Sequence, residues 1–236
     1  MRNALLFSAA FAAGACLAEV DSANVIGAIK VPTGSSQQLV AAAFAGYDGA
    51  AIKVDDMVAT GGLANGSKLY VAKPDATGYY VWNLVNGGWQ AANVVTIGAG
   101  GAKEDTGVLS GDVTVRPGTA FWVEPAAGSE AAYLIGQRPA AAVTTTTTAG
   151  VWNMIGNASV AAKTLTSSVL AAETGDRILI PSASGTTEYS YKAGDGKGWY
   201  YTTWAGGTPT KHYADPVIAA GAGFWYYSAK GRTINW

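Results

Sequence analysis

GTAFW at residues 118–122 returns as GAGFW at residues 221–225, and this pair of stretches decides how the fold is interpreted. A further glycine follows seven residues after each phenylalanine, at Gly128 and Gly231. Four more pairs occur in the same order: NVIG at 24–27 with NMIG at 153–156, GSKLYV at 66–71 with GDRILI at 175–180, YVW at 80–82 with YSY at 189–191, and GW at 88–89 with GW at 198–199. Six matches in one order predict two diverged copies of one module in tandem.

The local pattern favours strands. Short β-branched and aromatic runs, bounded by Gly, Pro or Asn, occur at residues 69–71, 79–84, 113–115 and 121–123. NGG at 86–88 predicts a hairpin turn. Short helical turns are expected at residues 37–44 and 167–173. The predicted fold class is therefore all-β, with two tandem, diverged β-sandwich-like or small-barrel modules and short helical turns.

These patterns divide the chain into four segments. Residues 1–18 are expected to be a signal peptide, 19–137 the first β module, 138–150 an Ala/Thr-rich linker and 151–236 the second β module. The Thr run at 144–148 favours extended backbone. The first module is longer, chiefly through residues 37–56 and the glycine-rich 98–101, and insertions of this kind normally occupy loops.

The first residues have the pattern of a secretory signal. Arg2 precedes an apolar run at residues 4–15, small residues follow at 16–18, and Glu19 is acidic. Such a run is too short to span a bilayer, which needs about 20 residues. The sequence predicts an exported protein, extracellular or at the cell surface, with periplasm or outer membrane left open. Lipidation of Cys16 is one alternative, and a buried N-terminal helix is another.

Composition excludes several classes of partner and site. Only 13% of residues are charged and the net charge is −1, with no cluster of Lys and Arg. Nucleic-acid binding depends on such clusters, so none is expected. Cys16 is the one cysteine, and cleavage after Ala18 would leave a chain without disulfides. A packed core must then provide the stability.

The second half also resembles a known group of proteins. It carries WNMIGN at 152–157, GD at 175–176, YSY at 189–191, GW at 198–199 and GAGFW at 221–225. This order is similar to secreted β-rich proteins of verrucomicrobia-type bacteria, whose modules have the pattern WNLxGNP, GD, YxY, GW and PGxGFW. Ala158 stands where the group has proline. The resemblance implies export and tandem β modules, and it brings no activity, cofactor or site residue.

No catalytic, cofactor or metal site is predicted. His212 is the single histidine, and we expect it in a polar loop. A glycosidase needs two carboxylates facing one target. Asp55 and Asp56 are neighbours, which face opposite ways on a strand, and the other candidates are Glu104, Asp105, Glu124 and Glu188. None of these carboxylates is present in both modules, so the protein is not expected to be an enzyme.

The function expected first is that of an exported structural or cell-surface protein. It would self-associate through its β-rich modules or bind components of the cell envelope. The alternative is a carbohydrate-binding module whose exposed aromatic residues stack on sugar rings: Trp199, Tyr200, Tyr201 and Trp204. A second alternative is a small outer-membrane β-barrel, because the chain ends on Trp236. The repeated pairs at 121–122 and 224–225 are expected to be structural, with one member of each in the core.

Overall fold

The computed structural model describes residues 26–32, 37–46, 51–73, 78–91, 93–97, 103–108, 113–166, 168–182, 185–194 and 198–236. Side chains are described for all of these except Ile26 and residues 93–97 and 103–108. The predicted signal peptide with Cys16, and the glycine-rich 98–101, lie outside the described residues.

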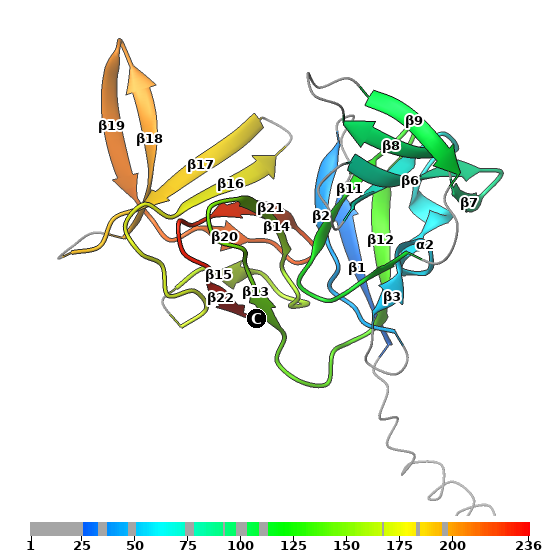
Figure 1. The fold of residues 1–236 in the computed structure, drawn as a ribbon, viewed down its shortest axis with the longest axis horizontal. Helices are drawn as coiled ribbons and strands as arrows, with labels where there is room; N and C mark the ends of the chain where they lie inside the picture. Colours follow the sequence, from blue (N-terminus) through cyan, green and yellow to red (C-terminus); the bar gives the residue numbers. More distant parts are fainter. Residues whose placement is uncertain are drawn as a thin grey trace, which may run out of the picture.

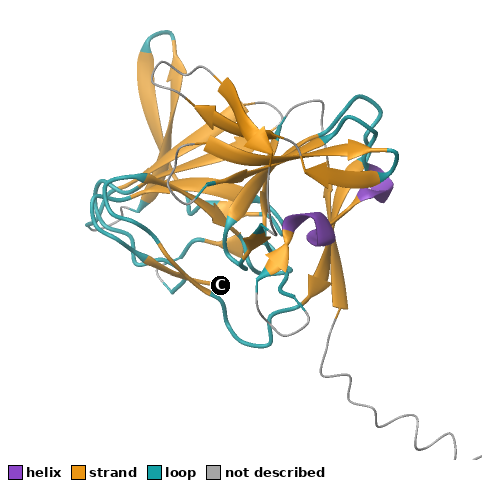
Figure 2. Ribbon diagram, turned by 45° about the vertical axis from the view of Figure 1, so that its right-hand side comes forward, coloured by secondary structure: helices purple, strands orange, loops and turns teal. Residues whose placement is uncertain are grey.

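The all-β prediction is confirmed. Antiparallel strands make up almost all of the regular structure (Figure 2). Within the described part of the chain, the helical elements are the short α2 (Val54–Met57) and the 3₁₀ turn η1 (Thr60–Gly62). Neither is long and apolar enough to cross a membrane.

The first half contains three sheets. The largest has the strand order β2 (Gln38–Ala41), β11 (Ala120–Glu124), β5 (Lys68–Ala72), β6 (Gly78–Val85), β8 (Asn93–Ile97) and β9 (Lys103–Val108), with β7 (Gly88–Ala91) also pairing β6. A second sheet has the order β1 (Ile26–Pro32), β12 (Ala131–Gln137) and β4 (Val58–Ala59), and a third joins β3 (Ile52–Lys53) to β10 (Thr114–Val115).

The second half has a matching set of sheets. Its largest has the order β14 (Trp152–Gly156), β21 (Gly223–Tyr227), β16 (Arg177–Ser182), β17 (Gly185–Tyr191), β18 (Trp199–Ala205) and β19 (Thr208–Tyr213). The two smaller sheets join β13 (Thr144–Thr146) to β22 (Thr233–Asn235) and β15 (Lys163–Thr164) to β20 (Val217–Ile218). The Thr run that sequence placed in the linker therefore forms a strand of this half.

Strand pairing shows which landmarks of the sequence are equivalent. Phe121 lies opposite Val40 in β2, and Phe224 lies opposite Ile155 in β14. The strand equivalent to NMIG is therefore β2, whereas NVIG leads into β1, which pairs with β12. The match of NVIG with NMIG was wrong as a structural correspondence, because two four-residue strings are too short to fix a register.

A second landmark is shifted by two residues. Trp82 lies opposite Leu69, and Tyr189 lies opposite Ile178, so these two aromatic residues are equivalent. The sequence had aligned Tyr189 with Tyr80 instead. The cause is the connection before each strand, since residues 73–77 separate β5 from β6 and only residues 183–184 separate β16 from β17.

The predicted turn at NGG is present, but neither predicted helical turn is a helix. Asn86 and Gly87 have φ of 51° and 77°, the type I′ geometry of a two-residue hairpin loop between β6 and β7. Residues 38–41 are strand β2, which pairs with β11 and whose Leu39, Val40 and Ala41 are buried. Ser168 and Val169 form a turn closed by the Thr166 carbonyl, which accepts hydrogen bonds from the N–H groups of Val169 and Leu170, and Leu170 then bridges to Ile234.

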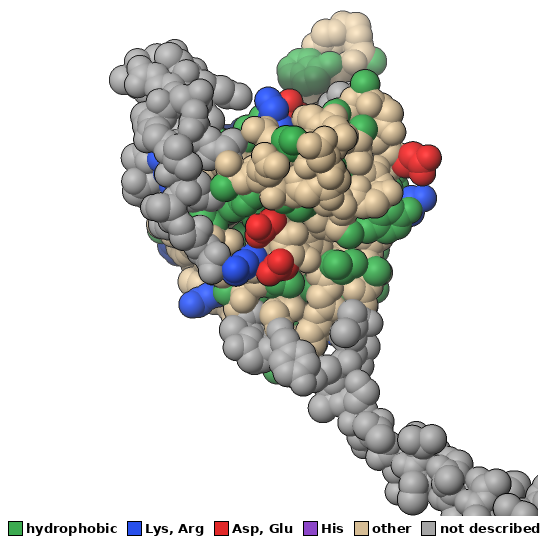
Figure 3. All heavy atoms as spheres, turned by 90° about the vertical axis from the view of Figure 1, so that its right-hand side faces the viewer, with side chains coloured by type: hydrophobic (Ala, Val, Ile, Leu, Met, Phe, Trp, Pro, Cys, Tyr) green, Lys and Arg blue, Asp and Glu red, His purple; other side chains and the backbone are tan. Residues whose placement is uncertain are grey.

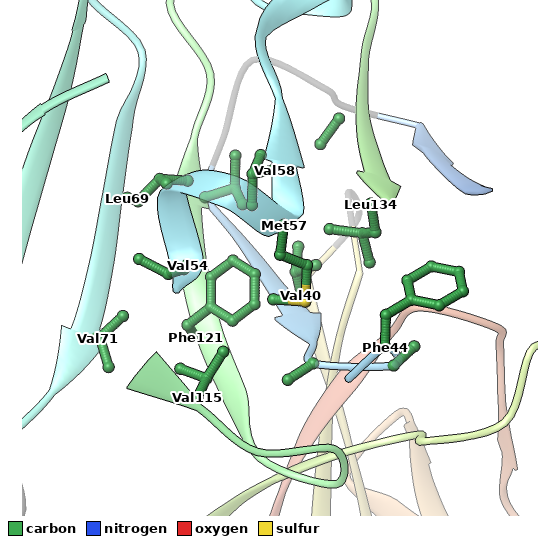
Figure 4. Packing of buried hydrophobic residues seen from close by; sticks show 14 of the residues in the cluster. Val40, Phe44, Val54, Met57, Val58, Leu69, Val71, Val115, Phe121 and Leu134 are labelled. Carbon is green, nitrogen blue, oxygen red and sulfur yellow. The ribbon is translucent and has the colours of Figure 1, made fainter. Parts of the chain in front are cut away.

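Each half has its own hydrophobic core. In the first half Phe121 packs among Val40, Val54 and Leu69 beneath α2 (Figure 4). In the second half the corresponding Phe224 packs with Ile155, Ile178, Trp199 and Tyr226, all almost fully buried. One member of each Phe-Trp pair is thus in the core, while Trp122 and Trp225 on the other face are half-buried.

The two halves are joined by backbone contacts of equivalent residues. Val40 is equivalent to Ile155, and Thr119 is equivalent to Ala222. The bridges Val40↔Ala222 and Thr119↔Ile155 are therefore the same contact made once from each half. Likewise, Ala41 N–H donates to the Gly221 carbonyl at 2.8 Å, and Gly156 N–H donates to the Gly118 carbonyl at 2.9 Å. The glycines that open GTAFW and GAGFW therefore perform the same task on the two sides of the junction, which has an approximate twofold symmetry.

Candidate functional site: the notch beside the β18–β19 hairpin

The β18–β19 hairpin projects from the body of the second half (Figure 1). Its strands pair over six positions, from Tyr200↔Tyr213 to Ala205↔Thr208. Gly206 and Gly207 close its turn with φ of 57° and 82°, again type I′ geometry. Every residue of β19 is exposed and only the first residue of β18 is buried, so the hairpin has no core of its own.

Strands β17 and β18 separate soon after they meet. Their ladder consists of two pairs, Tyr191↔Trp199 and Ser190↔Tyr200. Beyond these pairs, residues 185–189 of β17 and 201–205 of β18 diverge and leave an opening that we call the notch. It holds a groove of about 600 Å³ lined by hydroxyl, aromatic and carboxylate residues: Thr186, Thr187, Glu188, Ser190, Tyr200, Tyr201, Thr202, Thr203 and Trp204.

Among the described residues of the first half, other strands occupy the equivalent place. There β7 and β8 follow one another along β6, and β8 covers its first residues through Gly78↔Thr96 and Tyr79↔Val95. Because Trp82 is equivalent to Tyr189, Gly78 corresponds to Gly185 in β17. The positions that β8 covers in the first half therefore correspond to Gly185 and Thr186, at the outer end of the notch in the second half.

The backbone of β17 directs polar groups into the notch. Tyr191 N–H donates to the Asp176 carbonyl at 2.9 Å, and its carbonyl accepts from Gly175 N–H at 3.1 Å. The backbone N–H and C=O groups of Tyr191 therefore point away from β18. In an extended strand the backbone groups alternate in direction from residue to residue. Glu188 and Thr186 therefore point their N–H and C=O groups into the notch.

The same reasoning applies to β18. Ala214 N–H donates to the Trp199 carbonyl at 3.0 Å, so the backbone groups of Trp199 point toward β19. By alternation, the backbone groups of Thr202 and Trp204 face β17 across the notch. Within the described residues, the strand pairing gives these four residues no partner on that side.

One face of the hairpin carries a stack of aromatic and basic side chains. Lys211 Nζ lies 4.4 Å from the centre of the Tyr200 ring, which also packs against Tyr213 at 5.6 Å. On β17, Glu188 accepts hydrogen bonds from Arg177 Nε and Nη2 at 2.8 and 2.6 Å. Both partners are more than two-fifths exposed, so this ion pair adds little to stability.

The other face places the single histidine on a strand. His212 stacks on Tyr201 with 5.0 Å between ring centres, and its Nε2 lies 2.8 Å from Thr203 Oγ1. The prediction of a loop position for His212 was wrong, because the residue belongs to β19 and is paired with Tyr201. Burial, and then the neighbouring Tyr201, raise the pKa of Tyr189 above its ordinary value.

The four aromatic residues predicted as a sugar platform do not share one surface. Trp199 is only 2% exposed and packs edge-on against Tyr191 in the core, so its place in an exposed platform was wrong. Strand alternation puts Trp199 on the inner face, just where β18 leaves the core. Tyr200 and Tyr201 are half-buried on opposite faces, whereas Trp204 is 70% exposed near the tip.

The candidate carboxylates whose side chains are described lie in different places of the structure. Asp55 and Asp56 lie in α2 rather than on a strand, and Glu124 is held by Tyr70 Oη at 2.7 Å. Glu188 lies in the second half, where it forms an ion pair with Arg177. The side chains of Glu104 and Asp105 are not described. No group of three or more possible metal ligands occurs among the described residues.

Sequence reasoning missed a second aromatic cleft. Tyr79 and Lys73 from the first half face Trp152, Met154 and Trp225 from the second. The repeat had marked Trp225 as structural, and nothing in the pattern showed that the two halves would place these residues together. Charged side chains elsewhere are sparse, and on the face in Figure 3 both signs are interspersed.

Comparison with protein families, curated proteins and solved structures gave no match for this chain.

Proposed function

We propose that this chain is an exported, non-enzymatic structural or cell-surface protein that self-associates through the β18–β19 hairpin and the notch. The observation that carries the proposal is an exposed hairpin beside an open strand edge. Two-stranded hairpins are marginal in water unless they pack or join a larger sheet. Trp204 is 70% exposed and Tyr213 is 48% exposed, so the hairpin gains buried apolar area on association.

Export is the part of the proposal that rests on sequence. The charged start, apolar run and small residues of 1–18 support it, as does the resemblance to secreted β-rich proteins. Fractionation of bacteria that express the full chain tests it. We expect the protein in the envelope or medium, without residues 1–18. A full-length cytoplasmic product would contradict export.

Self-association is tested by sedimentation of the chain without its predicted signal peptide, over a hundredfold range of concentration. We expect the particle mass to increase with concentration, and Trp204→Ser to reduce it because the exposed indole leaves the contact. Val151→Ser is the matched control, since Val151 is 49% exposed in a turn of the same half. A wild-type protein that stays monomeric throughout would overturn the proposal.

A second candidate function is favoured by the lining of the groove. Tyr200 and Trp204 lie on one face of β18, with the hydroxyl of Thr202 between them and Glu188 and Ser190 alongside. Sugar rings stack on aromatic faces, while hydroxyl and carboxylate groups accept and donate the hydrogen bonds that orient them. A glycan-binding site on this face would therefore use Tyr200 and Trp204, without Trp199 or Tyr201.

Titration with soluble oligosaccharides tests this second function, with the affinity of each variant measured by isothermal titration calorimetry. In the wild type, binding should also quench or shift the emission of Trp204. Trp204→Phe should retain affinity because it keeps an aromatic ring. Trp204→Ala should lose affinity. Equal affinity of the alanine variant and wild type would exclude the groove as the binding site.

A further inference from the structure

We infer that the occupant of the notch is strand β18 from a second copy of this chain, added antiparallel to the open edge of β17. The inference rests on the proposed self-association and names the contact that produces it. Two strand edges of one chain supply the donors and acceptors: Thr186 and Glu188 on β17, and Thr202 and Trp204 on β18. Edge groups of this kind are templates for pairing with another chain.

The first half supplies the geometry of the completed sheet. Its β6 accepts β8 over Gly78 and Tyr79, the positions equivalent to Gly185 and Thr186. A strand at this place is therefore compatible with the fold. Within one chain, Ser190 lies opposite Tyr200. The same register, carried over to a β18 of a second copy that takes the place of the chain's own β18, sets Glu188 opposite Thr202 and Thr186 opposite Trp204. Each of these pairs directs its backbone groups toward the other, as a hydrogen-bonded pair requires.

The outer edge of β19 is protected against strand addition, and the notch is not. On β19, backbone alternation points Pro209 and Lys211 outward. Proline has no N–H to donate, and Lys211 brings a charge to the same edge. Proline and charged residues at edges prevent strand addition. The notch edge has Thr186, Thr187 and Thr202, with Glu188 already neutralised by Arg177.

The residues of β18 and β17 favour pairing between two copies of this chain over pairing with an unrelated strand. Both edges are rich in Thr and aromatic residues, which favour cross-strand packing. In the inferred pairing Tyr201 and Thr203 of one copy share a face with Tyr189 and Thr187 of the other. The contact also covers Trp204, the most exposed large apolar side chain among the described residues.

Removal of single backbone donors tests which edge is used. Thr202→Pro deletes an N–H that points into the notch, and Lys211→Pro, directly opposite on β19, deletes one that points outward. Neither deletes a hydrogen bond of the hairpin itself. We expect Thr202→Pro to decrease the association constant at least tenfold, while Lys211→Pro assembles like wild type. Assembly that survives Thr202→Pro overturns the inference but leaves self-association standing, whereas a monomeric wild type overturns both.

Cysteine pairs distinguish exchange between copies from closure within one chain. The chain without residues 1–18 has no cysteine, so Thr187→Cys and Thr203→Cys are made in separate chains and mixed under oxidation. A disulfide joining residues 187 and 203 of two chains, identified by mass spectrometry, supports the inference. Thr187→Cys mixed with Thr202→Cys, whose side chain lies on the other face, is the control. A double variant that forms only an intrachain disulfide, with no product from the mixture, overturns it.

Discussion

At the scale of single residues, the most consequential polar group of the second half is Asp176. It is 2% exposed, and its Oδ2 accepts hydrogen bonds from Tyr226 Oη at 2.6 Å, Glu173 N–H at 3.0 Å and Arg232 Nε at 3.2 Å. The carboxylate raises the pKa of Tyr226, after the larger effect of burial. The equivalent Ser67 in the first half is also fully buried, and its hydroxyl donates to the Ala64 carbonyl and accepts from Ala126 N–H.

Asp176→Ala should be strongly destabilising. It leaves the Tyr226 hydroxyl without its carboxylate acceptor and leaves Arg232 with Glu173 as its one remaining ion-pair partner among the described residues. Breaking a buried ion pair in this way costs about 3–5 kcal/mol. Tyr226→Phe removes one bond to the carboxylate and should cost about 1.5–3 kcal/mol. Urea unfolding of both variants and of the double variant measures the coupling. Fully additive losses would contradict a shared network.

Glu173 gives the second half a stability that depends on pH. Hydrogen bonds from Arg232 and Lys230 lower its pKa to about 2. Because the folded pKa lies below that of the unfolded chain, the contribution is present above about pH 4.3 and is lost as the pH falls toward 2. Glu173→Gln should therefore lower the urea midpoint at pH 6 and change it little at pH 2. An equal decrease at both values would exclude the charge as the cause.

Some residues of the site could be predicted from sequence, and others could not. The strand at 199–205 follows from its aromatic and Thr content, and period-two alternation separates Tyr200 from Tyr201. Alternation does not show where the core beneath a strand ends. Trp199 and Tyr201 share a face, yet Trp199 is buried while Tyr201 lies past the edge of the core and stacks on His212.

At the scale of elements, the sequence predicts strands well and their connections poorly. GTAFW and GAGFW identified β11 and β21 because the glycine and aromatic residues have the same structural task in both halves. The Ala-rich 37–44 has helical composition, but residues 38–41 form a strand whose last three residues are buried. The notch depends on whether β18 stays with β17 after two pairs, and no residue pattern encodes that path.

The hairpin should be removable without loss of the core. We predict that replacing residues 202–211 by Asn-Gly, which joins the opposed Tyr201 and His212 through a type I′ turn, leaves the free energy of unfolding within about 0.5 kcal/mol of wild type. Self-association should disappear in the same variant. Calorimetry on dilute protein measures the first effect and sedimentation the second. A large loss of stability would show that the hairpin supports the core.

At the scale of the whole molecule, the junction couples the two halves. A Cβ on Gly156 would collide with the Thr119 carbonyl and with the backbone of Ala41. Gly156→Ala should therefore weaken the junction by about 1–3 kcal/mol, the usual cost of overpacking. Gly61→Ala is the control, because a Cβ there meets nothing within 4 Å. In calorimetry we expect one unfolding transition for the wild type and two for Gly156→Ala. A single transition in the variant, at the same temperature as in the wild type, would argue against coupling of the two halves.

The twofold character of that junction has a consequence for valency. A contact that exchanges equivalent residues uses the same patch from both halves, so inside one chain it is saturated and offers nothing to a neighbour. Each chain then retains one notch and one hairpin. If two chains exchange hairpins reciprocally, every edge is satisfied and assembly stops at a pair. If each hairpin enters the notch of the next chain in line, an unmatched edge remains at both ends and the assembly grows as a filament.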